Sequence, residues 1–187
     1  MPKINPALGY EAILDRVLLT EDQLQSRISE LATQISHDYA GMDLLLICIL
    51  RGGVVFLSDL MRKLTIPHHI DFMAVSSYGV GARTNSGKPR IVLDLNTDIR
   101  GRHVLLVEDI VDSGITLDHV LRMLQTREPA SLDVCVLLNK ADRRVVHIPT
   151  RYVGFSIPNE FVFGYGLDID ELYRNLPFVG VVKQEYQ

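Results

Sequence analysis

Apolar residues recur at helical spacing early in the chain. One predicted helical face carries Leu24, Ile28, Leu31 and Ile35. Thr20 lies just before this series, and Gln23 follows it by three residues, which is the pattern of a capping box. Gly41 supplies a stop signal after the series. The spacing therefore predicts an amphipathic helix between Thr20 and Gly41.

Short apolar runs then alternate with helical patterns. Strands are predicted at residues 44–50, 70–76, 91–95, 104–107 and 132–138. Helices are predicted at residues 54–63 and 117–124. The run at 44–50 is apolar throughout, which is typical of a strand buried on both faces. Alternating strands and helices predict an α/β fold, with a mostly parallel sheet flanked by helices.

The pattern becomes loop-rich after Asn139. Pro149, Pro158 and Pro177 interrupt any long helix there. We therefore expect a core at about residues 40–145. The N-terminal segment and residues from about 146 to 187 would form a small hood over the sheet. A chain of 187 residues has the usual length of one domain, so we expect a single domain over 1–187.

Composition excludes several classes of protein. The chain carries 19 Lys and Arg against 23 Asp and Glu, a net charge of −4, which disfavours nucleic acid as a partner. The longest apolar run, 44–50, is far shorter than the ~20 residues that span a bilayer, and the N-terminus lacks the apolar core of a signal peptide. Cys48 and Cys135 lie inside apolar runs. We therefore expect a cytoplasmic protein, not associated with membranes, with two buried free thiols.

The strongest chemical signal follows the apolar run at 104–107. The residues that carry this signal are Glu108, Asp109, Asp112, Ser113, Gly114, Ile115 and Thr116, of which Ile115 is apolar. Gly114 lets a backbone approach an anion, Ser113 and Thr116 offer hydroxyl groups, and a helix start supplies N–H groups. Glu108 and Asp109 suit a sugar diol or Mg²⁺. The alternative is a capped helix beside solvated acids, but three acids around one such loop favour a phosphate site.

This stretch closely resembles the phosphoribosyl-pyrophosphate (PRPP) motif of type I phosphoribosyltransferases. The match to the hypoxanthine/guanine branch of that family extends from about Leu44 to Val182. The resemblance implies the type I phosphoribosyltransferase fold with a hood and a mobile active-site loop. It also implies transfer of the phosphoribosyl group from PRPP to N9 of hypoxanthine or guanine, giving IMP or GMP and diphosphate. Mg²⁺ is the implied cofactor, and a homodimer or homotetramer the implied assembly.

The resemblance assigns roles within this motif. It implies that Glu108 and Asp109 contact the ribose hydroxyls and the metal environment. The loop at 112–116 would grip the 5′-phosphate. Asp112 would be the base that accepts the purine ring proton.

Two further stretches resemble family loops that contact diphosphate or close the site. Arg51-Gly52-Gly53, after Leu50, resembles the diphosphate loop, in which a non-proline peptide is often cis. From the residues alone, the glycine pair is equally a turn before a helix. Ser77 and Tyr78 begin a polar stretch that resembles the mobile loop.

The last matches concern the purine and the metal. Lys140 resembles the lysine that contacts the purine 6-oxo group, although a lysine after a strand is often only solvated. The resemblance further implies that Phe161 stacks on the purine and that the Val162 backbone meets the purine edge. It also implies that Asp168 binds Mg²⁺ through water and that Arg174 faces diphosphate.

Two alternatives remain beside this interpretation. One is a regulatory module that senses PRPP with the same fold, and the other is a related enzyme that prefers xanthine. The chain keeps Asp112 and Lys140 and is net acidic, which favours an enzyme over the regulator. A panel of purine bases distinguishes the two enzymes.

Overall fold

The computed structural model describes residues 4–5, 9–76 and 90–187 of the chain. Its larger sheet has the strand order β4-β3-β2-β5-β6-β7. These strands are β2 (Leu44–Leu50), β3 (His68–Ser76), β4 (Arg90–Leu93), β5 (His103–Val111), β6 (Ser131–Asn139) and β7 (Tyr152–Ser156). All neighbouring pairs are parallel except β3 and β4. The predicted α/β fold with a mostly parallel sheet is confirmed.

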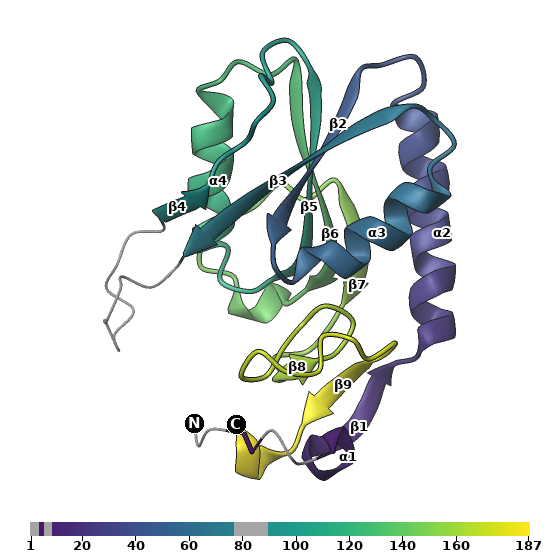
Figure 1. Ribbon diagram of the computed structural model, residues 1–187, viewed down its shortest axis with the longest axis vertical. Coiled ribbons are helices and arrows are strands. Elements are labelled where there is room, and N and C mark those ends of the chain that lie inside the picture. Colours follow the sequence, from purple (N-terminus) through teal and green to yellow (C-terminus); the bar gives the residue numbers. More distant parts are fainter. Residues whose placement is uncertain (1–3, 6–8, 77–89) are drawn as a thin grey trace.

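Helices cover both faces of this sheet. Figure 1 shows α2 (Glu21–Asp38) and α3 (Gly53–Lys63) on one side and α4 (Ile115–Gln125) on the other. In β2, Leu44, Leu46 and Cys48 pack in the cluster with α2 and α3. The alternate residues of β2 pack in a second cluster with α4. Burial on both faces explains why the run is continuously apolar.

The first long helix begins as predicted. The Thr20 side chain accepts a hydrogen bond from the Gln23 backbone N–H at 3.3 Å, and the Thr20 N–H donates to Gln23 Oε1 at 2.9 Å. This reciprocal pair satisfies two N–H groups that the helix start would otherwise leave unpaired. The capping box is therefore confirmed.

A crevice opens between the ends of β2 and β5. The chain passes from β2 through α3 to β3 on one side, and from β5 through α4 to β6 on the other. The β2–β5 ladder stops at Cys48 and Val107, whereas β5 stays paired with β6 as far as Val111 and Asn139. Open α/β sheets bind their ligands at such a reversal of strand order.

A second, three-stranded sheet forms the hood. It contains β1 (Leu14–Leu19), β9 (Val179–Val182) and β8 (Val162–Phe163), in that order and antiparallel. Short helical turns accompany it: α1 (Tyr10–Ile13) before β1 and η2 (Gln184–Tyr186) after β9. Another turn, η1 (Ala141–Arg143), follows β6. Figure 1 shows the hood beyond the carboxyl ends of β2 and β5, so it faces the crevice.

The structure corrects two predictions about secondary-structure elements. The division of a single domain into a core at about residues 40–145 and a hood stays a prediction; α2 precedes these bounds and β7 follows them. The segment after Asn139 contains three strands, β7 to β9, which were not predicted because they are only two to five residues long. The strand predicted at 104–107 continues to Val111, because its pairing with β6 continues. Glu108 and Asp109 therefore lie within β5.

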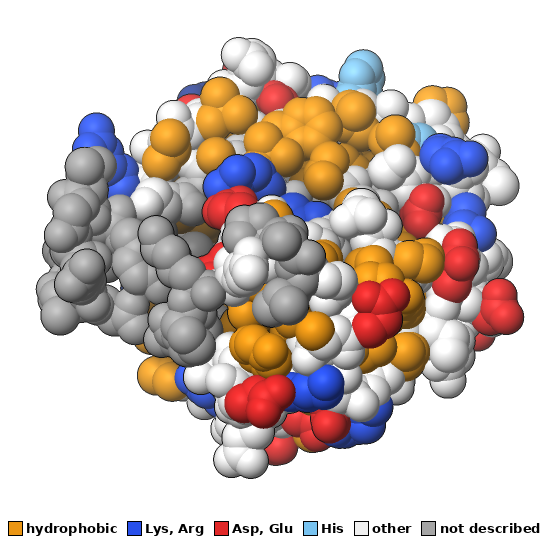
Figure 2. Space-filling model, turned by 60° about the horizontal axis from the view of Figure 1, so that its bottom comes forward, with side chains coloured by type: hydrophobic (Ala, Val, Ile, Leu, Met, Phe, Trp, Pro, Cys, Tyr) orange, Lys and Arg blue, Asp and Glu red, His pale blue; other side chains and the backbone are white. Residues whose placement is uncertain are grey.

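Other predictions concern thiols and surface charge. Cys48 and Cys135 are buried and free, as expected. Within the described residues, no helix is both long and apolar enough to cross a membrane. Seen from the hood side, acidic and basic side chains are interspersed over the surface (Figure 2), in keeping with the small net charge of −4.

Candidate active site

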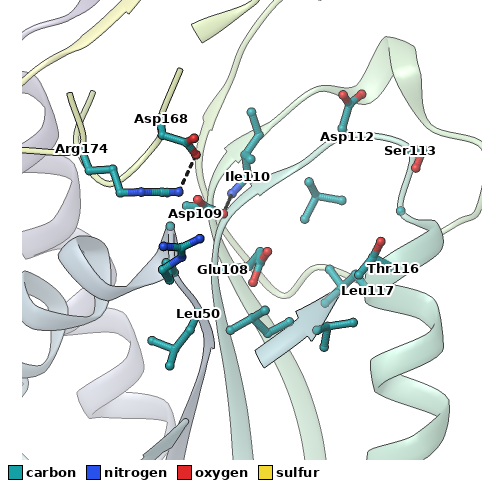
Figure 3. Close-up of a pocket in the computed structure, with 16 residues that line it drawn as sticks. Leu50, Glu108, Asp109, Ile110, Asp112, Ser113, Thr116, Leu117, Asp168 and Arg174 are labelled. Atoms are coloured by element: carbon teal, nitrogen blue, oxygen red, sulfur yellow. Dashed lines mark hydrogen bonds and ion pairs between the residues drawn. The ribbon is translucent and has the colours of Figure 1, made fainter. Parts of the chain in front are cut away.

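A cavity of about 340 Å³ occupies the crevice. Most of the predicted site residues line it, namely Arg51, Gly52, Glu108, Asp109, Asp112, Ser113, Gly114, Thr116, Asp168 and Arg174. They come from the turn after β2, the end of β5, the start of α4 and the hood (Figure 3). Residues far apart in the sequence therefore meet at the position that the strand order favours for ligands.

Two neighbouring acids form the floor of the cavity. Glu108 Oε2 is buried and, among the described residues, has no hydrogen-bond partner. Asp109 is 8% exposed, and its Oδ1 accepts a hydrogen bond from the Ile110 N–H at 2.7 Å. Burial raises the pKa of Asp109 to about 6. Burial and the adjacent Asp109 charge raise the pKa of Glu108 well above its usual range. Such a pair gains from a cation or from hydrogen-bond donors.

The loop between β5 and α4 has the conformation that an anion cradle requires. Gly114 has φ +83°, and a Cβ placed there would lie 2.8 Å from the Val146 carbonyl oxygen. The Ser113 carbonyl accepts hydrogen bonds from the N–H groups of Val145 and Val146, at 2.9 and 3.1 Å. The later loop therefore braces this one. Because α4 begins at Ile115, its positive dipole end lies beside the loop.

Cationic side chains surround Asp112. Arg143 Nε lies 3.2 Å from Asp112 Oδ1, as an ion pair without the geometry of a hydrogen bond. The Asp112 charge also acts on Lys140 and Arg144, where it favours their charged forms. Sequence reasoning missed Arg143. Its one signal is its position, three residues after Lys140 in the same loop.

The wall beside Asp109 combines the turn after β2 with the hood. The Leu50–Arg51 peptide bond is cis. Gly52 packs so closely that a Cβ would lie 1.7 Å from Asp109 Oδ2. The Arg51 side chain is exposed and pairs with Glu171 of the hood at 2.8 Å. Sequence reasoning did not identify Glu171, and the pattern offers no signal for it.

Arg174 ties the hood residues together. Its Nη2 lies 2.7 Å from Asp168 Oδ1 and 3.1 Å from Glu171 Oε2 (Figure 3 shows the Asp168 pair). Its Nη1 donates to the Gly166 carbonyl at 2.9 Å. The Arg174 charge also lowers the pKa of Asp109, against the larger effect of burial. One guanidinium therefore acts on acids from both walls.

The remaining predicted residues lie outside the lining of this cavity. They are Gly53, Ile115, Lys140, Phe161 and Val162. Gly53 is buried at the start of α3, whereas Ile115 is exposed. Phe161 packs against the hood core and Val162 is buried in β8. Ser77 and Tyr78 lie outside the described residues.

Lys140 is buried next to the cavity. Its backbone N–H donates to the Val111 carbonyl at 3.0 Å, which places it directly beyond the end of β5. Burial lowers the pKa of its ammonium group, and the Asp112 charge opposes this shift. Lys140 and Asp112 therefore belong to one charged region beside the anion loop.

The acids of the cavity suit a magnesium ion that takes most of its ligands from water and substrate. Within the described part of the chain, no three Asp, Glu, His or Cys side chains are grouped to hold a metal alone. Carboxylates are available on both walls, and Glu108 Oε2 lacks a hydrogen-bond partner among the described residues. Mg²⁺ typically takes one or two carboxylates and completes its shell with water and substrate phosphates. The donor set matches that pattern.

The fold and the anion loop define an α/β protein with an anion-binding site at a reversal of strand order, and comparison with known proteins identifies its family. A family model described as a phosphoribosyl transferase domain matches residues 18–170. The chain belongs to this family, which confirms the resemblance seen in the PRPP motif.

Individual relatives show which branch of the family the chain is most similar to among those compared. The hypoxanthine-guanine phosphoribosyltransferase of Mycobacterium avium is 51% identical, with 95% of this chain and 90% of the relative covered. The hypoxanthine phosphoribosyltransferase of Salmonella typhimurium is 49% identical, with 89% and 94% covered. A crystal structure of a hypoxanthine phosphoribosyltransferase from Staphylococcus aureus has a TM-score of 0.90 at 42% identity, with 97% and 98% covered.

Proposed function

We propose that the protein transfers the 5-phosphoribosyl group of PRPP to N9 of hypoxanthine or guanine, giving IMP or GMP and diphosphate in purine salvage. The observation that carries this proposal is the cavity itself, which joins the neighbouring acids Glu108 and Asp109 to the anion loop at 112–116. Relatives at about half identity over most of the chain support the same branch.

Each wall of the cavity has a role in the proposal. The loop at 112–116 holds the 5′-phosphate, and Glu108 and Asp109 accept hydrogen bonds from the ribose hydroxyls. The diphosphate is held by Arg51, Gly52, Gly53 and Arg174. Glu108, Asp109 and Asp168 would hold Mg²⁺ together with water and substrate oxygens, and the bound ion would supply positive charge against the leaving diphosphate.

The purine lies beyond the anion loop in this proposal. Lys140 donates to the 6-oxo group, Phe161 stacks on the ring and the Val162 backbone meets its edge. The bond from C1′ to diphosphate breaks with its electron pair, the bond from C1′ to N9 forms, and Asp112 accepts the ring proton. Arg174 and the 51–53 turn stabilise the negative charge that develops on the leaving group.

Assembly and setting are part of the proposal as well. We expect a single domain that forms a homodimer or homotetramer, which sedimentation velocity measures. The buried free thiols Cys48 and Cys135 suit a reducing, cytoplasmic setting.

The decisive experiment measures diphosphate release from PRPP with hypoxanthine, guanine, xanthine and adenine in the presence of Mg²⁺. An ammonium group has donors only, so Lys140 pairs with a 6-oxo group but opposes the 6-amino group of adenine. Sites built on such pairing reject the wrong partner by ~10⁴–10⁵-fold in kcat/KM. We expect adenine to be rejected on this scale.

Other outcomes have defined meanings. An adenine kcat/KM within about tenfold of that for hypoxanthine would rule out Lys140 as the 6-oxo reader. Preferred use of xanthine would assign the chain to a related transferase. PRPP binding without turnover of any base would indicate the regulatory alternative.

A further inference from the structure

The hood contributes Asp168 and Arg174 through one loop, residues 164–174, which we call the strap. Its backbone is closed on itself, because the Tyr165 N–H donates to the Leu176 carbonyl and the Gly166 N–H to the Arg174 carbonyl, both at 2.9 Å. Gly164, Tyr165 and Gly166 have φ of +89°, +50° and +96°. The strap is therefore a tightly turned unit, and a displacement of one of its residues shifts the others.

The Tyr165 side chain of the strap connects the strap to α3. Tyr165 is 3% exposed, and its hydroxyl donates to Asp59 Oδ2 of α3 at 2.5 Å. Gln25 of α2 donates to the same oxygen at 2.6 Å. Asp59 therefore receives hydrogen bonds from α2 and from the strap, and it fixes both to α3.

The hydrogen bond between Tyr165 and Asp59 lies near the turn at residues 51–53. α3 begins at Gly53, so Asp59 is on the helix that continues from this turn. A Cβ placed on Gly166 would lie 2.2 Å from the Gly52 carbonyl oxygen and 3.5 Å from Val55 Cβ. The strap therefore contacts the turn through backbone at Gly166, next to the residue that Asp59 holds.

We infer that Tyr165 and Asp59 are positioning residues, which set the distance between the strap and the 51–53 turn. In this way they present Asp168 and Arg174 to the same ligand group that the turn holds. This inference rests on the proposed function, because that ligand group is the diphosphate of PRPP. Neither Tyr165 nor Asp59 lines the cavity, so their effect is exerted through the strap.

The test is Tyr165→Phe with a matched control. Loss of one buried hydrogen bond to a carboxylate should raise the KM for PRPP by about tenfold. The kcat should also fall, because Arg174 stabilises the charge that develops on the leaving diphosphate. The KM for hypoxanthine should change by less than about twofold, because Lys140 and Asp112 lie in the loops after β6 and β5 and not in the strap. The control is Tyr152→Phe, since Tyr152 is 1% exposed and its hydroxyl donates to Asp38 at 2.8 Å, at the other end of the sheet.

Further variants separate positioning from general destabilisation. Asp59→Asn keeps an acceptor for the Tyr165 hydroxyl and should retain a lower KM for PRPP than Asp59→Ala. If Tyr165→Phe leaves this KM unchanged, or if Tyr152→Phe raises it equally, the inference is overturned.

A substrate-free measurement keeps this test distinct from that of the proposed function. Hydrogen exchange of residues 164–176 should be faster in Tyr165→Phe than in wild type, and unchanged in Tyr152→Phe. Equal exchange in all three proteins overturns the anchoring role. Faster exchange in a protein that uses no PRPP would preserve the anchor and reject the function.

Discussion

Acidic side chains at the two ends of the larger sheet differ in how many hydrogen-bond partners they have. At the amino end, Asp133 accepts hydrogen bonds from Tyr39 at 2.7 Å and from Arg151 at 2.9 Å. Asp38 accepts from Tyr152 at 2.8 Å and from Arg151 at 3.1 Å. The Arg151 guanidinium also lies over the rings of both tyrosines. Each of these two acids therefore has one tyrosine and one arginine partner.

At the carboxyl end, Glu108 and Asp109 are neighbours, and neither accepts a hydrogen bond from a tyrosine or an arginine among the described residues. Asp109 is buried, Glu108 is half-buried with its Oε2 shielded from solvent, and burial raises the pKa of both. At the amino end, by contrast, the hydrogen bond from Tyr152 lowers the pKa of Asp38. Crowded, poorly partnered acids in a cavity are typical of a functional site, whereas partnered acids stabilise the fold. Substitutions at the two ends should therefore have opposite consequences.

The largest expected effect is on turnover. Asp112→Asn removes the proposed base, and a general base is typically worth ~10²–10⁴-fold, so kcat should fall on this scale while PRPP still binds. The matched substitution at the amino end, Asp133→Asn, should leave kcat within about twofold. Steady-state kinetics of both variants provide the comparison, and a kcat for Asp112→Asn within about threefold of wild type would contradict the assigned role.

The next effect is on stability, and its sign differs between the two ends. Asp109→Asn removes a buried charge, so at pH 7 it should raise the free energy of unfolding by about 1–3 kcal/mol while impairing activity. Asp38→Asn should lower the free energy of unfolding, because it weakens a charge-assisted pair. Urea denaturation of both variants measures the two changes. A destabilised Asp109→Asn protein would show that Asp109 is a structural acid.

The pH dependence of stability sharpens the same contrast. The folded pKa of Asp109, about 6, lies above the ordinary unfolded value of about 3.9. The folded state therefore binds the proton more tightly, and the stability cost of Asp109 grows as pH rises from about 4 to about 6. The stability gap between Asp109→Asn and wild type should open over this range and vanish below about pH 4. A gap that is independent of pH would contradict the raised pKa.

The smallest expected effect concerns the paired end. Arg151→Gln removes two hydrogen bonds to acids, but the side chain is 43% exposed. We therefore expect a loss of about 1–2 kcal/mol in unfolding free energy. Its kcat/KM should equal that of wild type. A clear loss of activity at wild-type stability would show that the amino end takes part in function.

The sequence alone predicted the part of the molecule that local patterns specify. The strand at Leu44–Leu50 was recognisable because both of its faces are buried, and the helix after Thr20 because its capping box and apolar spacing agree. The anion loop was recognisable because acids, a glycine and hydroxyl residues occur together at 108–116. These signals lie within a few residues of each other.

What the sequence did not show depends on contacts between distant segments. The strand pair β1 and β9 joins opposite ends of the described chain, and β8 has two residues, so neither has a local pattern. Glu171 and Arg143 acquire partners only when the chain folds. Likewise, Glu108 and Asp109 lie inside β5 because β6 continues beside them, which the residues of β5 alone do not reveal.

The pairing of β1 with β9 has a consequence for synthesis on the ribosome. Val17 is paired with Gly180. β1 is therefore synthesised before the larger sheet, but it can pair with β9 only after all strands of that sheet have been made. Domains begin to fold during translation, and the larger sheet can therefore form while its cavity still lacks the hood. Asp168 and Arg174 follow every strand of the larger sheet in the chain, so the cavity gains its hood residues only after the strands that form its floor have been made.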